Sequence, residues 1–117
     1  MEDLDRHAAR LAALGHTARL AILRHVVQGG DSGCPAGEIQ RALGIPASTL
    51  SHHLSALAAA ELVQVERQGT FLRYRPDFPT LLALTEFIWE DCCGRDSRAP
   101  MHCGGWRKAA LDLLPHE

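Results

Sequence analysis

Three cysteines near the C-terminus form the most distinctive chemical pattern in this 117-residue sequence. Cys92 and Cys93 are adjacent, and Cys103 follows after a loop-like segment that contains Pro100. Neighbouring helical residues point about 100° apart, so two adjacent thiolates converge only where a helix frays, which Gly94 permits. With Cys103 folded back onto the pair, three thiolates form a pyramidal site. The pattern therefore predicts a binding site for a soft, thiophilic ion.

Several chemistries fit this cysteine cluster, and the residues alone leave them open. A pyramidal three-thiolate site suits As(III) or Sb(III), because each carries a lone pair over the open face, and we favour this interpretation. A tetrahedral site completed by His102 suits zinc, and thiolates also suit cadmium. A vicinal-thiol redox sensor with Cys103 as the resolving thiol is a third interpretation. The fourth is that the cysteines bind nothing, since free cysteines are usually buried and inert.

The remaining cysteine, Cys34, stands just before an expected helix. A helix N-terminus lowers the pKa of a nearby thiol. We interpret Cys34 as a small loop residue, with a further ligand or the remnant of another site as the alternatives.

Composition places the chain among single-domain globular proteins. Hydrophobic residues make up 46% of the sequence and the formal net charge is −2, so the chain can bury one core and is not globally basic. The N-terminus is charged, and no apolar run approaches the length of a membrane span. We expect a cytoplasmic protein whose cysteines serve metal or redox chemistry rather than disulfides. Neither a glycine-rich phosphate loop nor a Gly-x-Ser-x-Gly elbow is present, so we expect no enzyme activity.

The apolar periodicity predicts the elements that position these residues. Helices are expected at residues 3–14, 16–28, 36–43, 48–60 and 77–93, and strands at 62–67 and 71–75. Gly44-Ile45-Pro46 makes a tight connection between two short helices, which is typical of a helix-turn-helix. A β-hairpin directly after it is the order of a winged helix. We therefore predict a mainly α fold with a small β-hairpin wing in residues 1–93, followed by an inducer-binding tail in residues 94–117.

The second helix of the predicted helix-turn-helix has an unusual polar face. Short hydroxyl and imidazole side chains project away from its leucine stripe, and no charge appears before Glu61. Such groups hydrogen-bond to base edges and phosphates without repelling DNA, whereas His53 lies nearer the leucine side and is expected to pack. Arginines of the hairpin can reach phosphates or the minor groove. The predicted DNA-binding residues are Ser48, Thr49, Ser51, His52, Ser55, Arg67 and Arg73.

The first and last long helices predict a homodimer. Apolar residues wrap most of the way around the last helix, more than one core face requires, and the first helix is apolar for a peripheral element. Such helices often pair with a second copy of the same chain.

These features resemble the ArsR/SmtB family of metal- and metalloid-responsive repressors. The matching stretches are residues 14–23, residues 48–57, and Leu62-Val63 with Gly69 and Tyr74 in the wing, and the resemblance covers roughly residues 4–90. It implies a winged-helix homodimer that binds a palindromic double-stranded operator without inducer and releases it when the inducer binds.

The resemblance also bears on the inducer. The arsenic-responsive type carries Cys-x-Cys near the helix before the recognition helix, where this chain has only Cys34. The zinc-responsive type uses Asp and His on the last helix, which this chain does not match. Other members place a cysteine pair at the end of the last helix and a third cysteine shortly beyond, as Cys92, Cys93 and Cys103 are placed here. The resemblance thus implies As(III) or Sb(III) as inducer, with no cofactor needed for folding; the alternative is a thiol-redox or zinc/cadmium-responsive repressor of the same fold.

Overall fold

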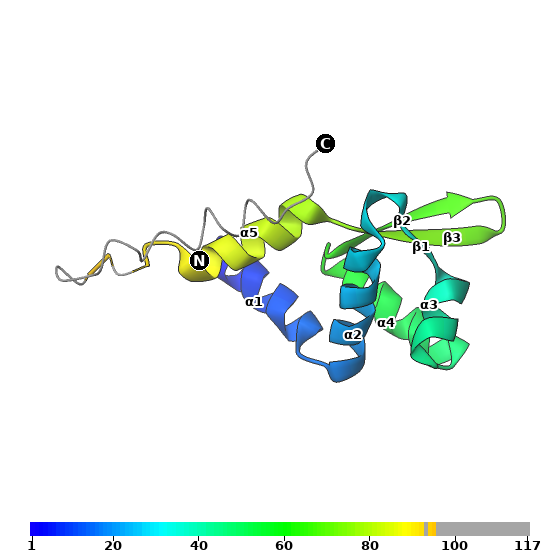
Figure 1. Ribbon diagram of the computed structural model, residues 1–117. Coiled ribbons are helices and arrows are strands. Elements are labelled where there is room, and N and C mark those ends of the chain that lie inside the picture. The colour runs from blue at the N-terminus through cyan, green and yellow to red at the C-terminus, as the bar shows by residue number, and fades with distance from the viewer. Residues whose placement is uncertain (93, 96–117) are drawn as a thin grey trace.

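The computed structural model describes residues 1–92, 94 and 95, which form a mainly helical fold with a small antiparallel sheet (Figure 1). The elements in chain order are α1 (Glu2–Leu14), α2 (Thr17–Gln28), a 3-10 turn η1 (Gly30–Ser32), β1 (Cys34–Pro35), α3 (Ala36–Leu43), α4 (Ala47–Ala59), β2 (Val63–Gln68), β3 (Phe71–Pro76) and α5 (Phe78–Trp89). The predicted winged-helix fold is confirmed. None of the described helices is long and apolar enough to cross a bilayer.

The helix-turn-helix consists of α3 and α4, joined at Gly44. This glycine has φ 66°, the left-handed conformation that ends a helix, and its N–H donates to Gln40 O at 2.9 Å. The β2–β3 hairpin follows α4 and turns at Gly69, which also has a positive φ of 62°. Figure 1 shows the hairpin and α3 at one end of the molecule and the paired helices α1 and α5 at the other.

The core lies where α2, α3 and α4 meet the base of the hairpin. Its fully buried side chains are Ile22, Val26, Ile39, Leu54, Leu57 and Leu62. Burying a side chain of this size contributes about 1.5–3 kcal/mol, so these helices are fixed chiefly by their shared apolar faces. This end of the fold is therefore a packed unit, and the face of α4 that points away from the core is left for other contacts.

The structure corrects the expected loop at Cys34. Cys34 and Pro35 form a short strand that pairs antiparallel with β3, Cys34 opposite Tyr74 and Pro35 opposite Arg73, in a sheet of order β1-β3-β2. A strand of two residues has no alternation to detect in a sequence, so only its tertiary partner reveals it.

The structure also corrects the end of the last helix. α5 stops at Trp89 and does not reach Cys92-Cys93, because Glu90 adopts extended backbone angles (φ −55°, ψ 134°) and Asp91 has φ 59°. Cys92 lies in the turn that follows, where its N–H donates to Trp89 O at 2.9 Å. Cys92 therefore lies outside the helix. Cys93 and Cys103 lie outside the described residues.

Candidate functional site

The polar face of α4 is open to solvent. All five predicted DNA-binding residues of this helix, Ser48, Thr49, Ser51, His52 and Ser55, are exposed. The opposite face is buried through Leu50, His53, Leu54 and Leu57. The predicted orientation of the helix is therefore correct. The exposed face carries hydroxyls and an imidazole and is free of carboxylates, so it can approach an anionic surface.

His53 fixes α4 against the start of α2. Its Nδ1 accepts a hydrogen bond from Arg19 Nε at 3.2 Å, and its ring lies 4.7 Å from that of His16. Burial, followed by the charges of His16, Arg19 and His52, lowers the pKa of His53. A neutral His53 is what this bond requires, because a protonated Nδ1 cannot accept from Arg19. The expectation that His53 packs is confirmed.

The two predicted wing arginines have different surroundings. Arg67 is exposed on β2. The guanidinium of Arg73 instead donates to Gln68 Oε1 at 3.2 Å, Ser32 O at 3.0 Å and Gly33 O at 3.3 Å. Arg73 thus ties the wing to the segment before β1, a role the sequence analysis missed because Ser32 and Gly33 lie some forty residues away. Contact between either arginine and DNA stays a prediction.

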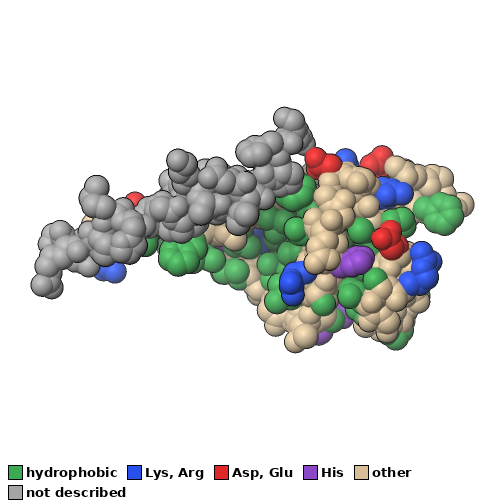
Figure 2. Space-filling model, viewed as in Figure 1, with side chains coloured by type: hydrophobic (Ala, Val, Ile, Leu, Met, Phe, Trp, Pro, Cys, Tyr) green, Lys and Arg blue, Asp and Glu red, His purple; other side chains and the backbone are tan. Residues whose placement is uncertain are grey.

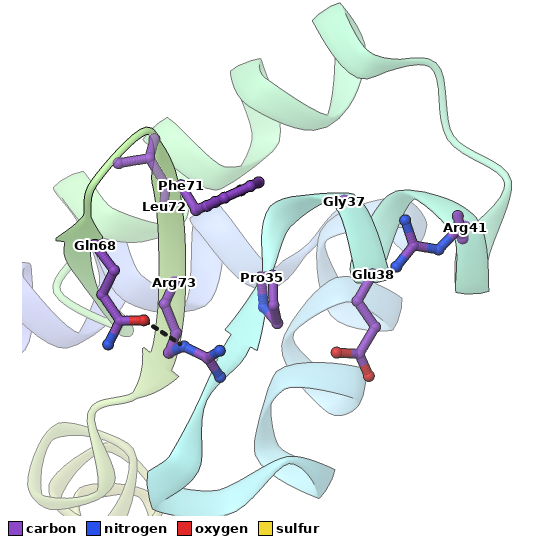
Figure 3. A pocket seen from close by; sticks show the side chains of 8 residues that line it. All are labelled: Pro35, Gly37, Glu38, Arg41, Gln68, Phe71, Leu72 and Arg73. Carbon is purple, nitrogen blue, oxygen red and sulfur yellow. Dashed lines mark hydrogen bonds between the residues drawn. The ribbon is translucent and has the colours of Figure 1, made fainter.

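A pocket of about 360 Å³ separates the hairpin from α3 (Figure 3). Phe71 at the hairpin tip lines it and is 71% exposed. Pro35, Gly37 and Glu38 form the opposite wall. The pocket keeps the N-terminal turn of α3 accessible.

Cys34 differs from its sequence-based expectation in reactivity as well as conformation. It is only 3% exposed. Burial first, then the negative charge of Glu38, raises the pKa of the thiol, while Arg73 acts in the lowering direction. The expected lowering by the α3 N-terminus is therefore wrong, because desolvation of the thiolate outweighs the helix dipole.

The predicted ion site is described only at Cys92, which is half-buried in the turn after α5. Its partners Cys93 and Cys103 fall outside the described residues, so the three-thiolate site stays a prediction. The structure places Cys92 alone, just beyond the end of a helix that packs on α1.

α1 and α5 share one end of the fold and expose an apolar face. The rings of His7 on α1 and Phe87 on α5 lie 4.3 Å apart. Figure 2 shows hydrophobic side chains gathered along this end. The large exposed ones on these two helices or next to them are Met1, Leu4, Leu11, Ile88 and Trp89. A contiguous apolar face of this kind is typical of a protein interface.

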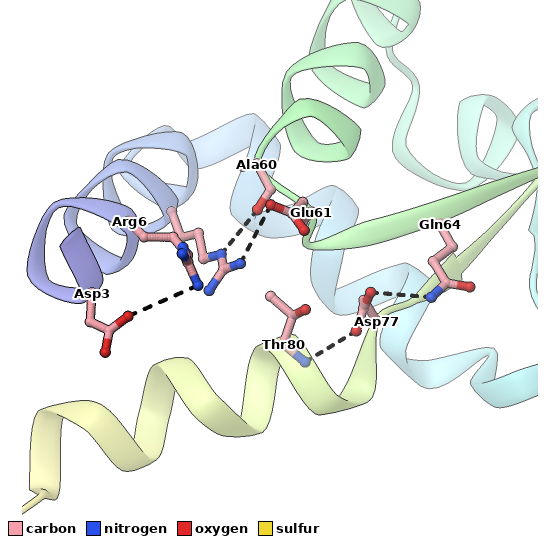
Figure 4. Close-up of polar contacts among 8 residues, drawn as sticks. Asp3, Arg6, Ala60, Glu61, Gln64, Asp77 and Thr80 are labelled. Carbon is pink, nitrogen blue, oxygen red and sulfur yellow. Dashed lines mark hydrogen bonds and ion pairs between the residues drawn. The ribbon is translucent and has the colours of Figure 1, made fainter.

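Polar contacts attach α1 to the end of α4 and the start of α5 to β2 (Figure 4). Arg10 of α1 donates from Nε to Ala60 O at 3.3 Å and pairs with Glu61 at 3.6 Å, at the end of α4. Asp77 caps α5 by accepting from the Thr80 N–H at 3.1 Å, and it accepts from Gln64 Nε2 of β2 at 3.1 Å. These contacts join α1 to the end of α4 and the start of α5 to the wing.

Residues 14–66, which contain the helix-turn-helix, match a family model described as a helix-turn-helix domain. The chain is also 34% identical over 70 residues to the HTH-type transcriptional regulator YgaV of Escherichia coli, a match that covers 60% of this chain and 69% of the relative. Fold and sequence together define a helix-turn-helix transcriptional regulator.

Solved structures narrow the class to a family. The homodimeric winged helix-turn-helix DNA-binding domain of a possible ArsR-family regulator from Mycobacterium bovis is 30% identical, with a TM-score of 0.60 and coverage of 83% of this chain and 90% of that chain. An ArsR-like transcriptional regulator from a Rhodococcus species has the same fold, with a TM-score of 0.71 at 22% identity over 100% of this chain and 99% of that one. The chain belongs to the ArsR family of winged-helix transcriptional regulators.

Proposed function

We propose that this regulator is a homodimeric repressor that binds operator DNA and dissociates when As(III) or Sb(III) binds the thiolates of Cys92, Cys93 and Cys103. The observation that carries the DNA-binding part is the exposed, carboxylate-free face of α4. Hydroxyls and imidazole on that face supply donors and acceptors for base edges in the major groove. Arg67 on the wing supplies a positive charge for a neighbouring phosphate.

The exposed apolar face of α1 and α5 supports the homodimer. Ile88 and Trp89 are 56% and 48% exposed on the last turn of α5, and Leu4 and Leu11 of α1 are exposed nearby. A second copy of the chain would cover this face. The dimer would set the spacing of the two α4 helices, which must lie about 34 Å apart to enter successive major grooves.

Introducing a negative charge on α4 tests DNA binding. The probe is a fluorescent duplex of the gene's own promoter, titrated with purified protein and followed by anisotropy. Ser51→Glu should weaken binding by at least about tenfold, since a carboxylate would face phosphates and base acceptors. Gln28→Glu is the matched control, because it adds the same charge at an exposed end of α2. Equal affinities of the two variants would show that α4 is not the DNA-binding helix.

The position of Cys92 just beyond α5 supports an inducer that acts through the dimer helices. Three thiolates gathered there would draw the C-terminal segment onto the end of α5. Because α5 is attached to β2 through Asp77 and Gln64, and packs on α1, such closure would alter the separation of the two α4 helices. A coupling free energy of about 1–3 kcal/mol is typical of such regulation.

An ion panel tests the inducer. The DNA-bound, reduced protein is titrated with arsenite, antimonite, zinc, cadmium and peroxide, and anisotropy reports release. The trivalent metalloids alone should release DNA, and Cys103→Ser should abolish the response, since closure needs the third thiolate. Release by zinc, cadmium or peroxide instead would replace the metalloid proposal with the metal-responsive or redox alternative. Normal release of Cys103→Ser by arsenite would refute the closure mechanism.

A further inference from the structure

A second group of metal-ligating side chains lies inside the fold, remote in sequence from the C-terminal cysteines. His25 of α2, Cys34 of β1 and Glu38 of α3 each place one ligand atom so that all three atoms lie within 4.8 Å of one another. Figure 3 shows Glu38 extending from α3 away from Phe71 of the wing.

The spacing of these atoms suits one ion. Ligands bound about 2.0–2.3 Å from a tetrahedral zinc ion lie about 3.3–3.8 Å apart, so atoms that lie up to 4.8 Å apart need to approach by at most about 1–1.5 Å. Glu38 is exposed and can adjust its carboxylate, whereas Cys34 is held by strand pairing with Tyr74. The position of the Cys34 sulfur is thus fixed by the strand, whereas the Glu38 carboxylate can move toward an ion.

One feature of the surroundings, an unpartnered nitrogen, favours a ligand over ordinary packing. His25 Nε2 is buried and has no hydrogen-bond partner among the described residues, an arrangement that costs free energy unless something occupies the nitrogen. Gly29 packs closely against the Cys34 sulfur, since a Cβ there would lie 2.8 Å from Sγ, and this contact helps to fix the position of the sulfur.

We propose that His25, Cys34 and Glu38 bind a divalent cation of the zinc class, with a water molecule as fourth ligand. Nitrogen, sulfur and oxygen donors together match zinc, which accepts all three. On binding, the Cys34 thiol loses its proton to solvent as the sulfur–metal bond forms.

The charges around Cys34 agree with this assignment. A divalent cation neutralises Glu38 and replaces the proton on sulfur. Because the three ligands come from α2, β1 and α3, the bound ion would fasten the helix-turn-helix to the strand that pairs with the wing.

Cobalt is the probe of choice, because a thiolate–cobalt bond gives a charge-transfer absorption band. The full chain with Cys92→Ser, Cys93→Ser and Cys103→Ser retains Cys34 as its one thiol. Titrated with Co²⁺ under reducing conditions, it should develop the band with one equivalent and lose it when Zn²⁺ is added. The result is independent of the proposed metalloid site, whose cysteines are absent from this variant.

Variants at the other two ligands distinguish a three-ligand metal site from cobalt binding by the Cys34 thiol alone. Glu38→Gln should weaken cobalt binding by about tenfold or more without disturbing the fold, since Glu38 is exposed on α3. Glu2→Gln, an equally exposed acid on α1, should leave it unchanged, and Zn²⁺ should raise the Tm of the parent chain but not of Glu38→Gln. Absence of the band, or an undiminished band in both Glu38→Gln and His25→Gln, would overturn the proposal.

Discussion

Cys34 lies in a strand between two helices, whereas Cys92 lies in a turn beyond the end of α5. Cys34 is 3% exposed, and its pKa is raised by burial and by Glu38. Cys92 is half-buried, next to a second cysteine in the sequence and one helix away from the wing. The first is positioned by the core before any ligand arrives. The second would need the proposed closure of the chain to form a site, which is what the proposed sensor requires.

Serine replacement should affect the two positions unequally. Cys34→Ser removes a sulfur that packs in the core, and we expect it to lower the free energy of unfolding by about 1–3 kcal/mol. Cys92→Ser should lower it by less than about 1 kcal/mol, since the turn is partly solvated. Urea unfolding of the reduced proteins measures both. Equal losses would mean that Cys34 is not part of the core.

Alkylation rates sharpen the contrast. In chains that retain only Cys34 or only Cys92, iodoacetamide should modify Cys92 at least about tenfold faster at neutral pH, because the thiolate is the nucleophile and burial disfavours it. The rate at Cys34 should still be rising above pH 9.0, the ordinary thiol value, in line with its raised pKa. A faster reaction at Cys34 would contradict the burial that separates the two thiols.

Asp77 tests the attachment of α5 without touching either cysteine. Asp77→Ala removes the N-cap and should cost about 1 kcal/mol of stability. Although burial opposes ionisation, hydrogen bonds from Gln64 and Thr80 lower the pKa of Asp77. Its contribution is therefore present above pH 3.8, the unperturbed value, and is lost as the pH falls through the lower pKa of the folded state.

The measurement for Asp77 is thermal unfolding of Asp77→Ala beside Asp31→Ala, an exposed acid in η1. The loss should be confined to Asp77→Ala and should shrink in acid. Cobalt binding at Cys34 should be the same in Asp77→Ala and the parent, because Asp77 is not one of the three proposed ligands. A loss of cobalt binding in Asp77→Ala would contradict the independence of the two regions.

His53 should produce the smallest effect, below about 1 kcal/mol, because one hydrogen bond is at stake. Its pKa in the folded protein lies below the ordinary 6.5, so folding favours the neutral form. Its contribution to stability is complete above pH 6.5 and is lost as the pH falls toward the folded pKa. Between about pH 7.5 and about pH 5.5, His53→Gln should lose less stability than the parent. Ser51→Ala, an exposed change on the same helix that removes no titratable group, should keep the parental slope, and a matching reduction there would show that His53 is not the group responsible.

Sequence reasoning located the long helices and the polar face of α4, because apolar residues at helical spacing fix both. It missed β1, which consists of two residues and exists only through β3. It extended α5 past Trp89, because the backbone angles of Glu90 and Asp91 leave no mark in residue type. The cluster at His25 was invisible for a related reason. The turn through η1 brings α2 back beside β1, and no spacing rule encodes that contact.

The central claim is that release of DNA is controlled from the C-terminal cysteines and not from Cys34. The direct test is to add arsenite to the promoter complex of the parent protein, Cys92→Ser and Cys34→Ala, after confirming equal starting occupancy of the DNA. Anisotropy should fall for the parent and for Cys34→Ala and stay constant for Cys92→Ser. Release from Cys92→Ser with none from Cys34→Ala would contradict the account and place the sensor inside the fold.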